Sequence, residues 1–124
     1  FLLDKSSIDE LKNIALSHPL KRARICLHKS EQCIVHEMII VAHRDTFIRP
    51  HKHPKDKPES YHVLMGNLIV KIFNNDGKII EKFYLSSKNH PKMYKIQGDV
   101  WHQPIPDRKK QVISINWQRN QCLA

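Results

Sequence analysis

The chain lacks the features that identify secreted, membrane or disulfide-stabilised proteins. Its three cysteines, Cys26, Cys33 and Cys122, form no CxxC pair, so neither a disulfide framework nor a cysteine metal site is indicated. No apolar segment is long enough to span a membrane. The apolar residues 1–3 are followed at once by Asp4, which does not fit a signal sequence. We therefore expect a cytoplasmic protein with reduced thiols and no membrane partner.

The chain also lacks any recognisable element for binding nucleic acids. Its net charge of +9 and pI of about 9.6 favour an anionic or phosphorylated partner. The basic residues are scattered, however, over residues 21–24, 52–57 and 108–110. None of these runs resembles a recognition helix, an aromatic-basic strand or a basic tail. Charge alone is weak evidence, and we do not predict nucleic-acid binding.

The 124 residues contain no repeat, linker or low-complexity segment, which favours one folded domain. Ser7 followed by Glu10 forms a capping box, and apolar residues then recur at helical spacing until Pro19. We expect an N-terminal helical segment over residues 1–20 and a β-domain over residues 21–124. The helix should cover an apolar face or an open barrel edge, or pack on a second subunit.

From about Arg22 the hydrophobic period changes to two, which is typical of strands. Asn75-Asp76-Gly77 is a strong hairpin signal. The predicted strands cover residues 24–28, 35–42, 46–51, 60–65, 68–73, 79–85, 93–96, 100–103 and 111–117. Many short strands at this spacing predict an all-β sandwich or barrel.

Four residues form a candidate metal-ligand set: His51, His53, Glu59 and His102. His51 and His53 are two apart, so both would point to one face of a strand, with Arg49 on the same wall. A barrel would bring Glu59 and His102 to the same point from other strands. Three imidazoles and one carboxylate suit one divalent transition metal, and Zn, Fe, Ni, Mn and Cu all remain candidates. No other cofactor is indicated.

The offsets in this set resemble the first motif of the cupin superfamily. His51-Lys52-His53 is followed by a five-residue gap, Glu59, six residues and Gly66. A later strand ends in His102, as in the second cupin motif. Within the superfamily, four segments look like the WbuC-like family of cupin fold metalloproteins: residues 22–28, 35–40, 48–54 and 59–66. The resemblance implies a single-domain jelly-roll β-barrel with one metal, but no established reaction.

The second motif departs from the cupin pattern in two places. Gln97-Gly98-Asp99 stands where cupins usually have Pro-x-Gly, and Pro106 occupies the place of a later Asn. The loop between His53 and Glu59 is also longer than usual. These differences leave the four ligands intact.

Two further residues are candidates for catalysis. Arg49 would point into the barrel, where it could clamp a substrate carboxylate or phosphate, or pair with an acidic residue such as Glu37. Tyr61 would face the pocket and could donate a proton, although such a tyrosine is often part of the core. His62 has the opposite parity from Glu59, so we place it outside the ligand set. Trp101 should face away from the metal.

These observations support three functional hypotheses. The first is a metal-dependent enzyme, such as an isomerase, epimerase or lyase, acting on a carbohydrate or nucleotide-sugar. The WbuC-like resemblance implies that it works in surface polysaccharide (O-antigen) biosynthesis. The second is a non-catalytic module that binds sugar or metal. The third is a metal-free sugar-nucleotide ketoisomerase with histidine as acid or base. In each case we expect an anionic or sugar-like small molecule as ligand and a homodimer, because an exposed sheet edge must be covered.

Overall fold

The computed structural model describes residues 1–88, 91–107 and 112–119, which form one helix and eight strands. Cys122 and the basic run 108–110 lie outside the described residues. Cys26 and Cys33 are free thiols. The elements in chain order are α1 (Lys5–Ser17), β1 (Arg22–Cys26), β2 (Val35–Ala42), β3 (Glu59–Met65), β4 (Asn67–Phe73), β5 (Ile79–Ser86), β6 (Met93–Ile96), β7 (Trp101–Pro106) and β8 (Val112–Arg119).

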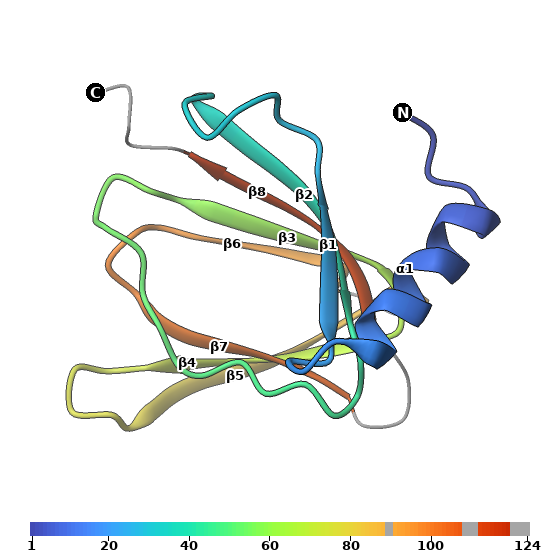
Figure 1. The fold of residues 1–124 in the computed structure, drawn as a ribbon. Helices are drawn as coiled ribbons and strands as arrows, with labels where there is room; N and C mark the ends of the chain where they lie inside the picture. Colours follow the sequence, from blue (N-terminus) through green and yellow to red (C-terminus); the bar gives the residue numbers. More distant parts are fainter. Residues whose placement is uncertain (89–90, 108–111, 120–124) are drawn as a thin grey trace.

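The strands form two antiparallel sheets packed face to face (Figure 1). One sheet has the order β1-β2-β8-β3-β6 and the other has the order β5-β4-β7. The strands that the structure describes are not joined into one closed hydrogen-bonded barrel, and their arrangement is that of a jelly-roll sandwich. The all-β prediction with a short N-terminal helix is therefore confirmed. The predicted division at residue 20 stays a prediction.

The main core lies between the two sheets. Along β4 the residues Leu68, Val70 and Ile72 are buried and alternate with less buried neighbours, as expected for a strand with one face on the core. Aromatic and aliphatic residues of both sheets complete this cluster: Val63, Leu85, Tyr94 and Val112. The β4–β5 hairpin turns at Gly77, whose φ of +82° is one that glycine adopts easily.

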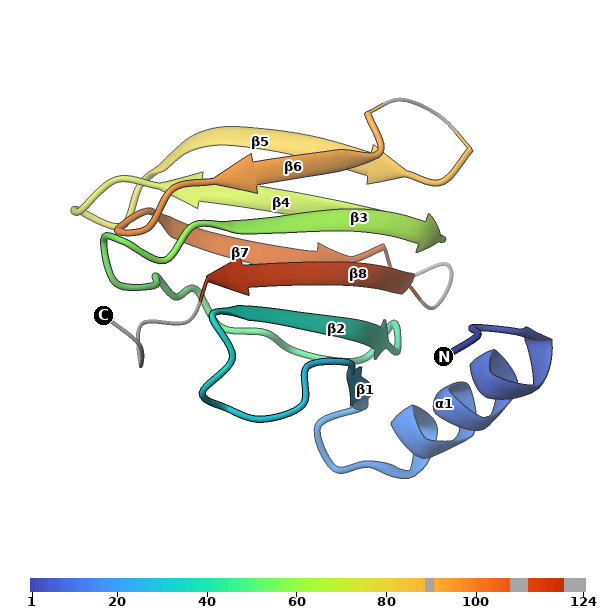
Figure 2. The same ribbon diagram turned by 90° about the horizontal axis from the view of Figure 1, so that it is seen from above.

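The helix covers the outer face of the five-stranded sheet, beside β1 and β2 (Figure 2). Leu11 and Ala15 are buried there against a second apolar cluster. The predicted cap at Ser7 is wrong, because the helix begins at Lys5 with Asp4 as its N-cap. The Asp4 carboxylate accepts hydrogen bonds from the Ser7 backbone N–H and hydroxyl, both at 2.9 Å. Among the described residues, no helix has the length and apolarity that crossing a membrane requires.

The segment between β2 and β3 contains no regular strand, so the predicted strand over residues 46–51 is wrong (Figure 1). Pro50 and Pro54 lack the backbone N–H that a ladder needs. Only His51 pairs with a strand, through two backbone hydrogen bonds to His102 of 3.0 and 2.9 Å. Without strand alternation, Phe47 is not in the interior but 71% exposed.

Replacing Leu11 by alanine should destabilise the fold more than replacing Ile14. Leu11 is 4% exposed and packs on the sheet, whereas Ile14 of the same helix is 48% exposed. Leu11→Ala should lower the free energy of unfolding by about 2 to 4 kcal/mol, and Ile14→Ala by well under half of that. Urea unfolding followed by circular dichroism measures both. Equal losses would mean that the helix does not dock through Leu11.

Candidate metal centre

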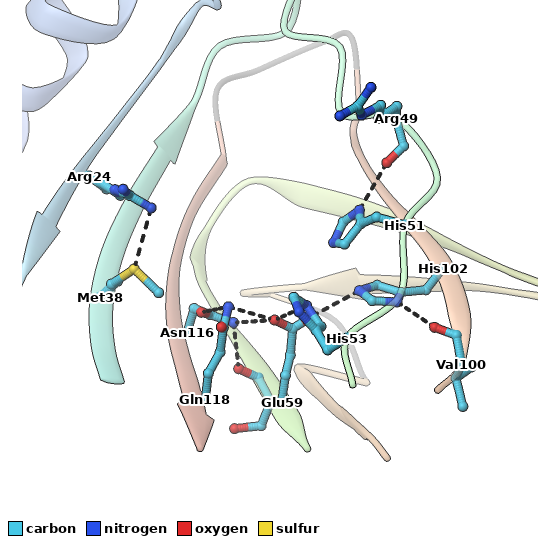
Figure 3. A network of polar contacts seen from close by, with 11 residues as sticks. Arg24, Met38, Arg49, His51, His53, Glu59, Val100, His102, Asn116 and Gln118 are labelled. Carbon is cyan, nitrogen blue, oxygen red and sulfur yellow. Dashed lines mark hydrogen bonds and ion pairs between the residues drawn. The ribbon is translucent and has the colours of Figure 1, made fainter. Parts of the chain in front are cut away.

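The four predicted ligand residues lie together in one cluster (Figure 3). Each offers one ligand atom, and these atoms lie within 4.8 Å of one another. Glu59 is the first residue of β3, and His102 lies on β7 of the opposite sheet. His51 and His53 come from the irregular segment that connects β2 to β3. The cluster therefore joins the two sheets through a connecting segment.

The Glu59 carboxylate is the centre of the cluster. Its Oε1 lies 2.9 Å from His102 Nε2, and its Oε2 lies 3.0 Å from His53 Nε2. Glu59 is 1% exposed and His102 is fully buried, while His51 and His53 are partly open to solvent. The His51 ring lies 4.3 Å from that of His102, measured between centroids. One side of the site is thus sealed and the other is accessible.

Backbone contacts at Nδ1 leave the Nε2 atoms of two imidazoles for a cation. The Nδ1 atoms of His51 and His102 each contact a backbone carbonyl at 2.9 Å, that of Arg49 and that of Val100. Such carbonyl contacts fix the tautomer of metal-ligating histidines. His102 therefore faces an acceptor at each ring nitrogen, the Val100 carbonyl at Nδ1 and the Glu59 carboxylate at Nε2. Both contacts are favourable if the ring carries two protons, or if it carries one proton at Nδ1 and a cation lies beside Nε2. The buried His53 Nε2 also has no aligned hydrogen-bond partner. The donor set therefore fits a divalent metal.

The electrostatics of the site keep its donors in the forms that bind metals. Burial by itself would raise the pKa of Glu59, but the contacts with His102 and His53 outweigh this and hold it at about 2. Partial burial lowers the pKa of His51, against the opposing effect of its hydrogen bond to Arg49. Near pH 7 the carboxylate is therefore ionised and His51 is neutral, as a ligand set requires.

The turn before β7 holds the segment that carries His53. The Asp99 N–H donates to the His53 carbonyl at 2.7 Å, and the Asp99 carboxylate lies 3.0 Å from Lys52 Nζ. Asp99 has φ +66°, a conformation that glycine adopts more easily, and it stands where the cupin pattern has its glycine. Gly98 is buried so close to Pro54 that a side chain there would overlap the backbone.

The comparisons with known proteins give a family and a fold. Residues 3–85 match the family described as Domain of unknown function (DUF6016), which is more than half of the chain. The chain belongs to the DUF6016 family. The matched region includes His51, His53 and Glu59 and ends before His102. No curated protein matches the chain.

Solved structures similar to the DUF6016 chain have the cupin fold. Oxalate oxidase in complex with the substrate analogue glycolate has a TM-score of 0.66 at 18% identity, covering 85% of this chain and 54% of that one. KdgF from Halomonas sp. has a TM-score of 0.62 at 15% identity, covering 85% and 84%. The Cupin_2 domain of an XRE family transcriptional regulator from Enterobacter cloacae has a TM-score of 0.62 at 18% identity. The match covers 79% of this chain and 95% of that domain's chain.

At these identities the likeness concerns the fold alone, and the predicted cupin fold is confirmed. The DUF6016 chain spans about half the length of the oxalate oxidase chain it matches. The narrower WbuC-like assignment stays a prediction.

Sequence reasoning missed two residues of β8 that contact the ligand set. The Gln118 Nε2 donates to Glu59 Oε2 at 2.8 Å, and Asn116 Nδ2 lies 3.4 Å from the same oxygen. A signal was present, because Ser114, Asn116 and Gln118 place polar side chains at every second position between the apolar residues 113, 115 and 117. Period-two polar residues on an inward face indicate a lined site.

The structure places Arg49 differently from the prediction. Arg49 is exposed, and Figure 3 shows its side chain turned away from the cluster, so its expected burial in the barrel is wrong. The prediction relied on the alternation of side chains along a strand, which does not apply to an irregular segment. Glu37, its alternative partner, instead accepts a hydrogen bond from Trp117 Nε1. Arg49 contributes its backbone carbonyl, which holds the ring of His51.

Tyr61 lies in the interior beside the ligand cluster. Its ring stacks on Tyr94 with centroids 5.3 Å apart. Burial and the nearby Glu59 charge raise the pKa of Tyr61, so its phenol stays protonated. His62 instead packs edge-on against Trp117 at 4.6 Å and is not in the ligand cluster. The ring of Trp101 lies under Lys52 Nζ, 5.3 Å from the nitrogen.

A side chain at Gly98 should weaken metal binding. In Gly98→Ala the added Cβ would overlap Pro54 and Lys55 backbone atoms, which must then move together with the adjacent His53. We expect the Kd for Zn²⁺ to rise by about tenfold or more, because losing a contact that positions a metal ligand lowers metal affinity by at least that factor. Titration of metal-free protein against a chelating dye measures this.

Gly77→Ala is the matched control for Gly98→Ala. A Cβ at Gly77 meets no atom within 4 Å, although its φ of +82° is strained for alanine. This variant should lose about 1 kcal/mol of stability and keep the wild-type Kd. An unchanged Kd in Gly98→Ala would show that the turn does not position His53.

The Glu59 carboxyl should dominate the acid sensitivity of the metal-free protein. Its pKa falls from 4.5 in the unfolded chain to about 2, so its stabilisation is complete above pH 4.5 and is lost as the pH falls toward 2. The full effect is roughly 3 kcal/mol. Urea unfolding from about pH 6 to about pH 3 should show a steeper loss for wild type than for Glu59→Gln. Parallel curves for the two proteins would contradict the assignment.

Proposed function

We propose that the protein is a mononuclear metal-binding cupin and a metal-dependent enzyme acting on a carbohydrate or nucleotide-sugar. The observation that carries this proposal is the convergence of His51, His53, Glu59 and His102 within 4.8 Å, on a fold that leaves one side open. Because this set has the donor types and tautomers of a transition-metal site, metal binding is the chemistry that the residues support best.

His51, His53, Glu59 and His102 would hold the ion, with Zn, Fe, Ni, Mn and Cu as candidates. A bound dication supplies a Lewis acid that polarises an oxygen of a small ligand. Four protein donors are fewer than many of these ions accept, which leaves places for ligand oxygens. The ionised Glu59 carboxylate and the neutral His51 imidazole keep the site able to take a dication at neutral pH.

Two residues would act on the ligand directly. The Tyr61 hydroxyl, kept protonated by burial, would donate a hydrogen bond or a proton to a ligand oxygen in the interior. Arg49 would meet an anionic group at the rim, since its guanidinium is exposed near the entrance rather than buried. The excess positive charge of the chain, including Lys52 beside the site, favours an anionic ligand.

The substrate class rests on resemblance. The WbuC-like segments support a role in surface polysaccharide (O-antigen) biosynthesis, with isomerisation, epimerisation or elimination on a sugar derivative as the reaction. A small oxygen ligand also agrees with the fold neighbour oxalate oxidase, which was solved with glycolate.

Two alternatives predict different observations. A non-catalytic sugar- or metal-binding module is supported by the Cupin_2 domain of a transcriptional regulator, which has a similar fold. Such a module would bind metal without turning over any sugar. A metal-free ketoisomerase would instead use the histidines as acid or base and would hold no metal after purification.

We also propose a cytoplasmic homodimer. The free thiols Cys26 and Cys33 agree with a reducing compartment. The edge strand β5 exposes Ile80 and Tyr84, with 64% and 58% of their surface accessible, and a second copy could cover them.

Metal content of protein purified without added metal tests the proposal. Wild type should carry about one transition metal per chain, and elemental analysis should show most of it lost in His51→Ala and Glu59→Ala, since each removes a donor. His43→Ala serves as a control, because His43 contacts Asp45 and lies outside the cluster. If wild type neither retains nor takes up stoichiometric metal, the proposal fails.

A further inference from the structure

Two amide side chains on β8 form a second layer behind the candidate ligands. Gln118 Nε2 donates to Glu59 Oε2 at 2.8 Å and to Asn116 Oδ1 at 2.9 Å. Asn116 Nδ2 contacts the same Glu59 oxygen at 3.4 Å and the Ser60 carbonyl at 3.3 Å. Asn116 is fully buried, and Figure 3 shows both amides gathered at the Glu59 carboxylate.

This network admits only one orientation of its amide groups. If Gln118 were reversed, its oxygen would face the Glu59 carboxylate and the Asn116 oxygen, and all three are acceptors. If Asn116 were reversed, its oxygen would face the Ser60 carbonyl. Each group therefore fixes the other, and together they fix the carboxylate. Glu59 cannot rotate about its terminal bond without breaking a buried hydrogen bond.

From this geometry we propose that Gln118 and Asn116 are positioning residues that orient the Glu59 carboxylate for a metal ion. The inference rests on the proposed metal site and adds two residues from a strand that carries none of the four ligands. The donors crowd Glu59 Oε2, so Oε1 keeps more lone-pair capacity for a cation.

The chemical type of these two residues supports the assignment. A lysine or arginine would also hold the carboxylate, but its positive charge would offset that of Glu59 and repel a dication. The amides of Gln118 and Asn116 donate hydrogen bonds without adding charge. They therefore orient the carboxylate and leave its full charge available to the metal.

Removing the Gln118 amide should weaken metal binding while the fold persists. Gln118 is only partly buried and lies near the end of β8, so the nearly isosteric Gln118→Leu should fold, and Gln118→Met offers a second variant. We expect the Kd of metal-free protein for Zn²⁺ to rise by about 10-fold to 100-fold, as for other residues that orient metal ligands. The absorption spectrum of the Co²⁺-loaded protein should change as well, because the carboxylate is no longer held.

A matched control separates this effect from general destabilisation. Thr46→Val also removes a side-chain hydrogen bond to a neighbouring group, here the Leu20 carbonyl, but Thr46 contacts none of the ligands. Its Zn²⁺ affinity and Co²⁺ spectrum should equal those of wild type, whatever stability it loses.

A double-mutant cycle tests whether Gln118 acts through Glu59. In the Glu59→Gln background, Gln118→Leu should change the Zn²⁺ Kd by less than about threefold, because the group to be positioned is gone. A full additive loss there would overturn the inference, and so would a wild-type Kd and spectrum in both Gln118 variants. If wild-type protein binds neither Zn²⁺ nor Co²⁺, the proposed function and this inference both fail. If wild type binds these ions and the Gln118 variants bind them equally well, this inference alone fails.

Discussion

The buried carboxylate of Glu59 is the constraint on which the rest of this site depends. An ionised carboxylate away from water is costly unless charged or polar groups surround it. Here those groups come from the opposite sheet, from the connecting segment and from the neighbouring strand: His102, His53, Gln118 and Asn116. Because this one charge must be compensated, side chains from three parts of the chain meet at the Glu59 carboxylate. A dication at that point would complete the compensation.

The scaffold around this charge is built from backbone contacts and a conventional core. The two hydrogen bonds between His51 and His102 attach an otherwise irregular segment to β7, and the turn at Gly98 and Asp99 holds its other end. The apolar cluster between the sheets packs β3 against β4 and β5, and β7 pairs with β4. The ligands can thus be held accurately although two of them lie outside any strand.

Much of the fold could be predicted because strand periodicity is local. The strand over residues 35–42 and that over 93–96 have the predicted bounds, and the other strands found differ at their ends by a few residues. The prediction of a strand over residues 46–51 is wrong because Pro50 and Pro54 have no backbone N–H for a hydrogen-bonded ladder. The side-chain direction that was inferred for Arg49 from strand alternation is therefore wrong as well. Arg49 was placed inside although it is exposed.

The sequence by itself determined which residue types could bind a metal, since the offsets from His51 to Glu59 and Gly66 are a property of the chain. Tertiary structure alone decided how they meet. The pairing of His51 with His102 and the approach of Gln118 to Glu59 each join residues that are far apart in the sequence. Such contacts depend on which strands and segments pair in the folded chain, and local spacing does not contain that information.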